Sequence, residues 1–506
     1  MPITASILYD LLRCPYRVAL DAFGDPALRD GANPFVRLLW ERGTLYEREV
    51  IAKLKQPFRD LSGLDAEEKE QQTLQAIARG DSLIYGGRLS ADDLLGMPDL
   101  LRKVQGGYIP GDIKAAAAEE GAGEESEGRL KLHYAVQLAL YVDLLERHGA
   151  SAGRSGFIWD IDGEEVPYDL TQPQNSTSAD TLWDEYQSAL AQARTILARQ
   201  IIPQPAYAAV CKLCHWHTAC IDELTKADDL TLIPDLSRRV RDAMQSRVAT
   251  VAELAASNPA GFIKGKKTVF KHLGAERLRK LHARAVMLKQ AMPQPFLRAP
   301  ITLRVLPTEL FFDVEVDPLR DICYLHGIVD RLEGDNGSER FMYFFCEEPT
   351  PAAERDAFAG AFAYLSNQVD SVIYYYSKYE RTIYRKLQAK YPDVCTADDI
   401  ERLFEPPRSI DLYFDVVERA TEWPTRDYGL KTLAAYLGFN WRDKHPSGAA
   451  SVEWFDRWVR DRDPAVRQRI LDYNEDDCRA TRVLLDGIRA LGAGGFEKCP
   501  SASLRD

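Results

Sequence analysis

Residues 96–114 read Gly96-Met-Pro-Asp99-Leu-Leu-Arg-Lys-Val-Gln-Gly106-Gly107-Tyr-Ile-Pro-Gly-Asp112-Ile-Lys114. Two strand-like runs flank the paired glycines, a pattern that predicts a β-hairpin. The hairpin places Asp99 near the start of one strand and Asp112 and Lys114 near the end of its neighbour. Since residues two apart on a strand share a face, Asp112 and Lys114 point the same way. Two carboxylates and a lysine that converge can hold a divalent metal and activate a water beside a phosphate.

A helix is predicted directly after this hairpin, at residues 133–147, and it carries Gln137 and Tyr141 four residues apart on one face. The hairpin and helix together resemble the PD-(D/E)xK nuclease core in its RecB-like form, which has a trailing Gln-x-x-x-Tyr motif. The resemblance implies that Asp99 and Asp112 bind metal, and that Lys114 positions the attacking water or stabilises the developing charge. It also implies that Gln137 and Tyr141 orient the lysine and touch the nucleic acid.

RecB-like nucleases usually carry an upstream histidine or glutamate in a Gly-x-x-x-His/Glu helix. Arg42-Gly43-Thr-Leu-Tyr46-Glu47 occupies that place, with glutamate rather than histidine. The resemblance therefore implies that Glu47 is a further metal ligand of the first site. An exposed glutamate on an ordinary helix is the alternative interpretation of Glu47.

A cysteine pattern brackets the same region. Its members are Cys14, Cys211, Cys214 and Cys220, of which the last three have the spacing C-x2-C-x5-C. One early and three late cysteines resemble the iron–sulfur staple of RecB-like nucleases, in which a [4Fe–4S] cluster ties together the two ends of the domain. Two alternatives stay open: structural zinc, with His215 or His217 in place of a thiolate, and buried free thiols.

The other five cysteines have no ligand spacing, and we expect them to be small buried hydrophobes. They are Cys323, Cys346, Cys395, Cys478 and Cys499. An odd total of nine cysteines without a secretion signal argues against a disulfide framework.

A second acidic pattern begins with Leu310-Phe-Phe-Asp313-Val-Glu315-Val316, an apolar strand that carries two acids on one face. Buried acids are costly unless they are paired or bind a cation. Far downstream, Tyr473 and Asp477 lie four residues apart at the start of a predicted helix. An exposed edge strand is the alternative for the first two acids.

This pattern resembles a DEDDy exonuclease on an RNase H-like fold. The resemblance implies that Asp313, Glu315 and Asp477 hold two Mg²⁺ or Mn²⁺ ions about 4 Å apart, and that Tyr473 orients the attacking water. The family usually has an aspartate in the middle of the chain where Glu380 stands here. We take Glu380 as that ligand and Asp411, which competes for the role, as a ligand or its neighbour.

The composition excludes several classes of protein. The chain has 506 residues, of which 45% are hydrophobic and 28% charged, as is usual for soluble globular proteins. That length fits about two to four domains. No apolar run approaches the roughly 18 residues of a membrane span, and the first residues lack the features of a signal peptide. We therefore expect a cytoplasmic protein with no membrane partner.

The charge is uneven along the chain. The net charge of −13 argues against nucleic acid wrapping around the whole surface. Residues 237–289, however, carry 13 lysines and arginines against three acids. This segment faintly resembles helix–hairpin–helix repeats, which offer amides and lysines to phosphates. The expected contacts to nucleic acid are Lys264, Lys266, Lys267 and Lys271. A solvated helical linker is the alternative.

These observations predict an α/β protein with three parts. Residues 1–225 would form a RecB-like PD-(D/E)xK domain of the restriction-endonuclease-like fold, residues 226–300 a basic helical connector, and residues 301–495 an RNase H-like DEDDy domain. The resemblance implies metal-dependent hydrolysis of DNA at single-stranded ends, in repair, recombination or defence. Three alternatives remain: an RNA exonuclease, a non-catalytic nucleic-acid-binding scaffold, and a subunit that is active only beside a helicase.

Overall fold

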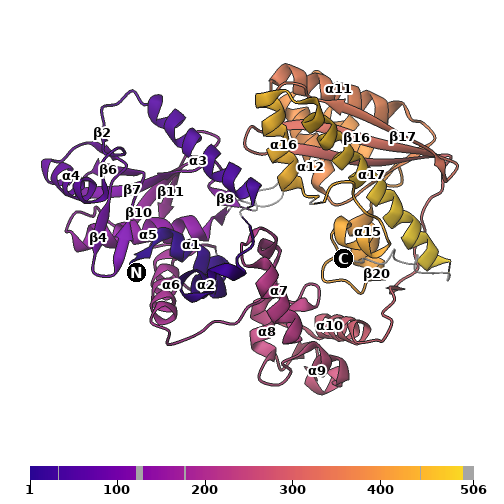
Figure 1. Cartoon of the computed structure of the whole chain (residues 1–506), viewed down its shortest axis with the longest axis horizontal. Coiled ribbons are helices and arrows are strands. Elements are labelled where there is room, and N and C mark those ends of the chain that lie inside the picture. The colour runs from indigo at the N-terminus through magenta and orange to yellow at the C-terminus, as the bar shows by residue number, and fades with distance from the viewer. Residues whose placement is uncertain (32, 121–128, 176–177, 445, 494–506) are drawn as a thin grey trace. The chain divides into compact units, whose positions relative to one another are not determined.

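The computed structural model describes the whole chain except residues 32, 121–128, 176–177, 445 and 494–506. It divides into two compact units, Met1–Glu223 and Leu224–Asp506 (Figure 1). The segment that we expected as a connector, 226–300, belongs to the second unit. The expected end of the last domain, at residue 495, lies outside the described residues.

The first unit is built on a six-stranded mixed sheet with the order β11-β10-β7-β6-β3-β2. Its strands are β2 (Arg59–Asp60), β3 (Leu83–Tyr85), β6 (Leu100–Val104), β7 (Gly107–Ile113), β10 (Ser155–Trp159) and β11 (Glu165–Asp169). Strands β6 and β7 form the predicted hairpin, with Leu100 paired to Gly111. The turn needs its glycines, because Gly106 and Gly107 have φ values of 95° and 153°.

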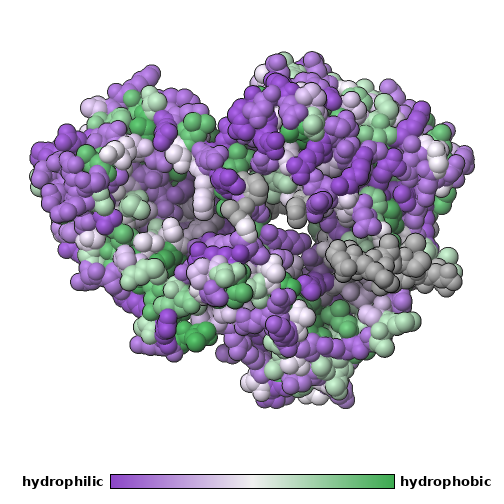
Figure 2. Space-filling model, viewed as in Figure 1, coloured by the Kyte–Doolittle hydropathy of each residue, from purple (hydrophilic) through white to green (hydrophobic). Residues whose placement is uncertain are grey.

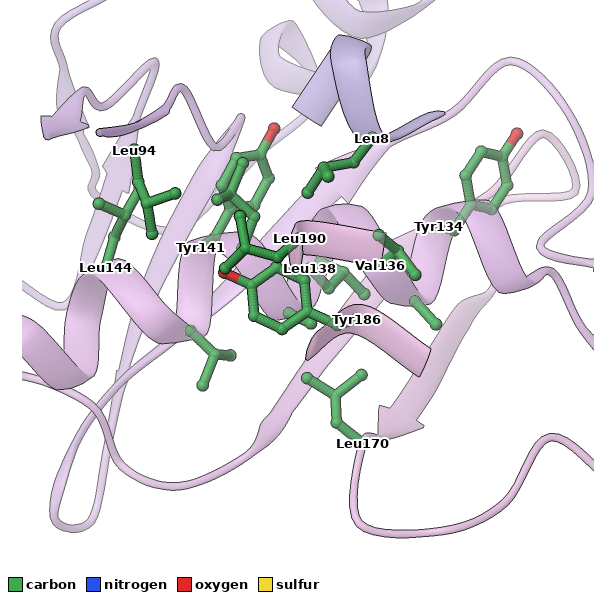
Figure 3. Close-up of a cluster of buried hydrophobic side chains, with 14 of the residues drawn as sticks. Leu8, Leu94, Tyr134, Val136, Leu138, Tyr141, Leu144, Leu170, Tyr186 and Leu190 are labelled. Carbon is green, nitrogen blue, oxygen red and sulfur yellow. The ribbon is translucent and has the colours of Figure 1, made fainter. Parts of the chain in front are cut away.

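The first unit also contains helices. They are α1 (Ala5–Arg13), α2 (Pro15–Phe23), α3 (Pro34–Ala52), α4 (Ala66–Arg79), α5 (Leu132–Arg147), α6 (Leu182–Leu197) and α7 (His217–Lys226), the last of which crosses the boundary between the units. Helix α5 packs on β7 and β10 of this sheet. It is the central helix, since most of its side chains are buried. Figure 3 shows Leu138, Tyr141 and Leu144 of α5 packed with Leu94 and with Leu190 of α6. The helix predicted at residues 133–147 is confirmed.

Smaller strands complete the first unit. A three-stranded sheet has the order β1-β5-β4, from Ile3–Thr4, Leu94–Gly96 and Leu89–Ala91, and β8 (Glu119–Glu120) pairs with β9 (Arg129–Leu130).

The second unit contains a five-stranded sheet with the order β17-β16-β15-β18-β19. Its strands are β15 (Thr308–Asp317), β16 (Ile322–Leu332), β17 (Asp335–Phe345), β18 (Ser371–Tyr375) and β19 (Ser409–Asp411). The first three strands are antiparallel, whereas β18 and β19 run parallel to β15. The helices after residue 350 are α11 (Pro351–Asn367), α12 (Tyr379–Lys390), α13 (Ala397–Phe404), α14 (Glu418–Ala420), α15 (Leu430–Tyr436), α16 (Gly448–Asp461) and α17 (Pro464–Gly492).

Alternation along β15 assigns its side chains to two different cores. Leu310, Phe312 and Val314 pack with residues of α11, α12 and α13. Phe311 packs instead with residues of α15 and α17. Asp313 and Glu315 share the side of Phe311, because residues two apart on a strand share a face. The long helix α17, yellow in Figure 1, lies against this face.

The basic segment folds as short helices around a core of its own. They are α8 (Arg238–Met244), α9 (Val251–Ala256) and α10 (Ala275–Leu288), with a small hairpin of β12 (Ile263–Lys264) and β13 (Lys267–Thr268). A further short pair joins β14 (Phe296–Leu297) to β20 (Thr421–Glu422). Helix α10 is tied to β20 by Arg284, whose Nε lies 2.7 Å from Oε2 of Glu422, with both side chains 1% exposed.

The described surface is mostly polar. In the view of Figure 2 hydrophilic residues cover most of both units, and apolar residues are scattered among them. Of the helices in the described part of the chain, none is long and apolar enough to cross a membrane.

The Arg284–Glu422 pair gives a prediction about stability. Replacing Glu422→Gln should lower the free energy of unfolding by about 3–5 kcal/mol, because it removes the buried countercharge of a buried guanidinium, whose other acidic partner, Asp235, is 61% exposed. Urea unfolding of the full chain measures the effect, with the exposed Glu418→Gln as the matched control. Equal unfolding midpoints for the two variants would contradict the prediction.

Candidate active sites

The β6–β7 hairpin of the first unit holds the carboxylates of Asp99 and Asp112 next to each other. Oδ2 of Asp99 accepts a hydrogen bond from the main-chain N–H of Ile113 at 2.8 Å, and Oδ1 of Asp112 accepts one from the N–H of Asp99 at 3.3 Å. Asp112 is fully buried. Each acid is therefore held by the main chain of the other strand, so the pair is fixed by the hairpin itself.

Lys114 completes this group. Its Nζ lies 2.9 Å from Oδ2 of Asp112. Burial opposes the lysine's charge, but the attraction of Asp112 and then of Asp99 outweighs it and raises the pKa of Lys114. Burial and the repulsion of Asp112 raise the pKa of Asp99, and Lys114 partly offsets them. The site therefore contains more negative charge than one lysine balances, which favours a divalent cation.

Gln137 and Tyr141 lie on one face of α5, as their spacing predicts. Nε2 of Gln137 donates to Oη of Tyr141 at 3.0 Å, and that hydroxyl donates to the carbonyl of Met97 at 3.3 Å. Within the described residues neither side chain hydrogen-bonds to Lys114. They hold the main chain at Met97, two residues before Asp99, instead. Any effect of this pair on Lys114 is therefore transmitted through that part of the main chain.

Glu47 lies near the first site. It is half-buried on α3, and its Oε1 accepts a hydrogen bond from the hydroxyl of Tyr85 at 3.0 Å. Its charge is also among the causes that raise the pKa of Asp99. In the described parts of the chain, however, Glu47, Asp99 and Asp112 do not bring one oxygen each within 4.8 Å of one another. The structure thus groups Asp99, Asp112 and Lys114 tightly and Glu47 more loosely.

The four cysteines of the pattern are brought together from both ends of the first unit. Cys14 lies between α1 and α2, Cys211 in a turn at Ala209–Leu213, and Cys220 in α7. Burial, followed by the charges of the other three thiols, raises the pKa of Cys220 to about 12. The four thiols therefore lie close enough to affect one another, and of the eight cysteines that the structure describes none forms a disulfide.

The spacing of these thiols and the contact of His215 bear on the zinc alternative. A tetrahedral zinc site with Zn–S bonds of about 2.3 Å holds its sulfurs about 3.8 Å apart. Among the described residues no three cysteine or histidine ligand atoms lie within 4.8 Å of one another. Nε2 of His215 lies 2.6 Å from Oδ1 of Asp21. The described thiols are therefore not gathered as closely as a zinc ion would hold them.

The remaining described cysteines, Cys323, Cys346, Cys395 and Cys478, are all buried, as predicted. Cys499 lies outside the described residues.

The second site contains the one group of three possible metal ligands found among the described residues. Asp313, Glu315 and Asp477 each place an oxygen within 4.8 Å of the other two. The first two come from β15 and the third from α17. Burial, followed by the repulsion of Glu315 and Asp477, raises the pKa of Asp313. Burial and Asp477 raise the pKa of Glu315 to about 8, and Lys431 opposes them.

Two residues that sequence reasoning missed hold Asp477. Nζ of Lys431 lies 2.9 and 2.8 Å from the two oxygens of Asp477, and Nε1 of Trp441 donates to Oδ1 at 2.7 Å. Neither residue belongs to a motif that the sequence analysis identifies. The positive charge of Lys431 also opposes the rise in the pKa values of Asp313 and Glu315.

Asp313 and Glu315 have their own hydrogen-bonding partners. Asn474, fully buried on α17, donates from Nδ2 to Oδ2 of Asp313 at 2.7 Å. The hydroxyl of Tyr324 donates to Oε2 of Glu315 at 3.3 Å and lies 2.7 Å from Oγ of Ser451. These partners fix the orientation of both carboxylates.

Tyr473 lies one turn before Asp477 on α17 and is 2% exposed. Nζ of Lys431 lies 4.8 Å from the centre of its ring. Burial, followed by the charge of Asp477, raises the pKa of Tyr473. The phenol therefore keeps its proton at neutral pH and remains a hydrogen-bond donor beside the carboxylates.

Glu380 and Asp411 lie outside the group of three. Glu380, in the first turn of α12, is 3% exposed, and burial followed by Asp411 raises its pKa. Oδ1 of Asp411 accepts main-chain hydrogen bonds from Ser377 and Tyr413, both at 2.9 Å. Oε2 of Glu380 and Oδ2 of Asp411 are buried without a hydrogen-bond partner among the described residues. Such buried oxygens fit a bound cation.

The basic segment is less available than its composition suggests. Arg241 and Arg284 are buried and paired with acids. The four lysines expected to contact nucleic acid, Lys264, Lys266, Lys267 and Lys271, are all exposed, on or next to the β12–β13 hairpin. Other basic residues of the segment, among them Arg239, Arg247 and Arg279, are exposed as well, so this hairpin is one of the places where its positive charge faces the solvent.

Two family models match the chain. Residues 19–221 match the PD-(D/E)XK nuclease superfamily, and residues 310–488 match the RNase H superfamily. The first match contains Asp99, Asp112 and Lys114, and the second contains the group of three acids. A search of curated proteins found no match for this chain.

The raised pKa of Glu315 predicts a pH dependence in protein freed of metal by a chelator. The folded state keeps the Glu315 proton up to about pH 8, whereas the unfolded chain loses it near the usual value of 4.5. The folded state therefore binds the extra proton between these values, and its stability falls as the pH rises through them. Glu315→Gln should remove this loss of stability. The increase in melting temperature of the variant over wild type should therefore be larger at pH 8 than at pH 5, by about 2 °C or more.

The exposed Glu405→Gln is the matched control, and saturating Mn²⁺ should reverse the order of wild type and variant, because the variant lacks a metal ligand. An equal gain at both pH values would show that Glu315 ionises normally in the folded state.

Proposed function

Since residues 19–221 form a domain of the PD-(D/E)XK nuclease superfamily and residues 310–488 form one of the RNase H superfamily, we propose that this protein is a metal-dependent nuclease with two active sites, which degrades DNA from single-stranded ends. The two matches support a hydrolytic nuclease in general. The observation that carries the proposal is the buried group of Asp313, Glu315 and Asp477. Such a group is stable when it binds cations.

In the first site the chain's own groups have separate tasks. Asp99 and Asp112 would hold the metal, with Glu47 reaching it directly or through a water. Lys114, kept protonated by Asp112, would stabilise the negative charge that develops on the phosphate. Gln137 and Tyr141 would keep the stretch before Asp99 in place.

In the second site Asp313, Glu315 and Asp477 would hold the metal ions, with Glu380 and Asp411 as additional or neighbouring ligands. Tyr473, which keeps its phenolic proton, would orient the attacking water. At either site a bound Mg²⁺ or Mn²⁺ would polarise the phosphate and lower the pKa of a water molecule. Lys431 would balance part of the carboxylate charge and support the departing negative charge.

We also propose that Cys14, Cys211, Cys214 and Cys220 hold a [4Fe–4S] cluster. The donor set consists of four thiols from two distant parts of the chain, and their spacing is wider than zinc requires. Such a cluster would join α1 and α2 to the end of the domain. The exposed lysines of the β12–β13 hairpin would guide the phosphate backbone.

Cleavage assays on anaerobically purified full-length protein test the two active sites. With Mn²⁺ and end-labelled single-stranded DNA, RNA and duplex DNA, Lys114→Ala and Asp313→Ala should each remove one class of products. Each loss should reach about 10²-fold or more, as expected when a charge-stabilising group is removed. The double variant should be inactive.

The exposed Lys103→Ala and Asp335→Asn are matched controls that should cleave as the wild type does. Products that stay the same in both active-site variants would refute the assignment of the sites. A wild type that binds but never cleaves would favour a scaffold or a subunit that needs a helicase.

Metal analysis tests the cysteine site. The anaerobic protein should contain about four iron and four sulfide per chain, and Cys220→Ser should lose most of both. The buried Cys395→Ser should keep them. One zinc without iron would favour the zinc alternative.

A further inference from the structure

A row of aromatic rings and cations leads away from Lys114 of the first site. Its members are Tyr134, Lys131, His133, Tyr9 and Arg13. The centre of the Tyr134 ring lies 5.8 Å from Nζ of Lys114 and 5.3 Å from Nζ of Lys131. In Figure 3 Tyr134 stands at one end of α5, apart from Leu138, Tyr141 and Leu144. The row therefore starts beside the proposed catalytic group and not in the middle of the core.

The row continues onto α1. The ring of His133 lies 4.4 Å from that of Tyr134 and 5.0 Å from that of Tyr9, in edge-to-face geometry at 69° and 89°. The guanidinium of Arg13 lies 4.8 Å from the centre of the Tyr9 ring. Helices α1 and α5, which carry these residues, pack directly against each other. The rings and cations are thus held on two packed helices and not on a loop.

Solvent reaches much of this row. Tyr9 and His133 are half-buried, and Arg13 is exposed. Within the described residues Arg13 forms no ion pair. Burial, followed by the positive charges of Arg13, Lys131 and Lys114, lowers the pKa of His133 to about 4. His133 is therefore a neutral, flat ring at physiological pH, surrounded by cations.

A purely structural role explains only part of the row. Tyr134 belongs to the core of the first unit and is 9% exposed. The core does not account for an exposed arginine over a half-buried tyrosine, or for the cations gathered around the ring of His133. Rings that offer a face for stacking, interleaved with cations, are the typical arrangement for binding single-stranded nucleic acid.

We propose that Tyr9, Arg13 and His133 form a binding site for a single strand of nucleic acid that leads into the Lys114 site. Unstacked bases would lie against Tyr9 and His133, and Arg13 would contact a phosphate. This inference rests on the proposed function of the first site and specifies its substrate as a strand with free bases. A duplex, whose bases are already stacked on one another, would gain little from these rings.

Binding of full-length protein to labelled oligonucleotides tests the site. Fluorescence anisotropy with Ca²⁺ would compare single-stranded oligo-dT, oligo-rU and a DNA duplex. Tyr9→Leu should weaken single-strand binding about 10-fold, since a stacked base is lost, and should change duplex binding less than 2-fold. Tyr9→Phe should bind as the wild type does. Comparison of oligo-dT with oligo-rU shows whether the strand is DNA or RNA.

Arg13→Gln tests the same site at an exposed position where folding is not at risk, and should weaken single-strand binding about 3-fold through a lost phosphate contact. Its matched control is Arg154→Gln, since Arg154 is also exposed and lies 4.0 Å from the centre of the Trp183 ring. Arg154→Gln should bind as the wild type does.

The outcomes separate this inference from the proposed function. Wild-type affinity in both Tyr9→Leu and Arg13→Gln, or an equal loss for single strand and duplex, would overturn the binding site while cleavage by the wild type still supports a nuclease. Single-strand binding that depends on Tyr9 in a protein that cleaves nothing would uphold the binding site and refute the nuclease.

Discussion

Both units of this protein place carboxylates of like charge beside one another and away from water, and this electrostatic cost determines what surrounds them. Asp112 is fully buried, and Glu315 and Asp477 are only 6% and 5% exposed. Burial and the repulsion of neighbouring acids raise the pKa of Asp99 in the first unit and of Asp313 and Glu315 in the second. The fold can keep them ionised only with a nearby positive charge, which comes from a lysine, from a bound cation or from both.

The two units supply the lysine in different ways. Lys114 follows Asp112 by two residues, directly after the end of β7, so the local backbone places it beside its partner. Lys431 lies on α15, 46 residues before Asp477 in the sequence, and reaches it because α15 packs against α17. The charge of the first site is thus balanced by a residue close in the sequence, whereas the charge of the second site is balanced by a residue that only tertiary packing brings near. A loosened α15 would therefore disturb the carboxylates of the second site directly.

This difference explains how much could be predicted from the sequence. Period-two alternation placed Asp112 with Lys114 and Asp313 with Glu315, and four-residue spacing placed Tyr473 and Asp477 on one face of α17. These relations depend only on the geometry of one strand or one helix. Both superfamily domains could also be recognised, since their motifs occur in order along the chain.

The residues that sequence reasoning missed depend on the approach of separate elements. Lys431 and Trp441 reach Asp477 from α15 and the turn after it, and no spacing within the sequence encodes that contact. A count of charges along the sequence misses buried ion pairs for a similar reason. The surplus of basic residues at 237–289 includes Arg241 and Arg284, which are neutralised inside the protein.

Asn474 shows how a position without any functional signature can fix the orientation of a proposed metal ligand. Its amide donates to Oδ2 of Asp313. This hydrogen bond fixes the rotation of the carboxylate and turns its other oxygen, Oδ1, away from Asn474. On β16, Gly327 is the residue paired with Asp313, and a Cβ atom there would lie 1.6 Å from Oδ1 of Asn474. Any side chain at position 327 would push the amide away from Asp313. The orientation of a proposed metal ligand on one strand thus depends on a missing side chain on its neighbour, because only glycine leaves room for the amide that holds it.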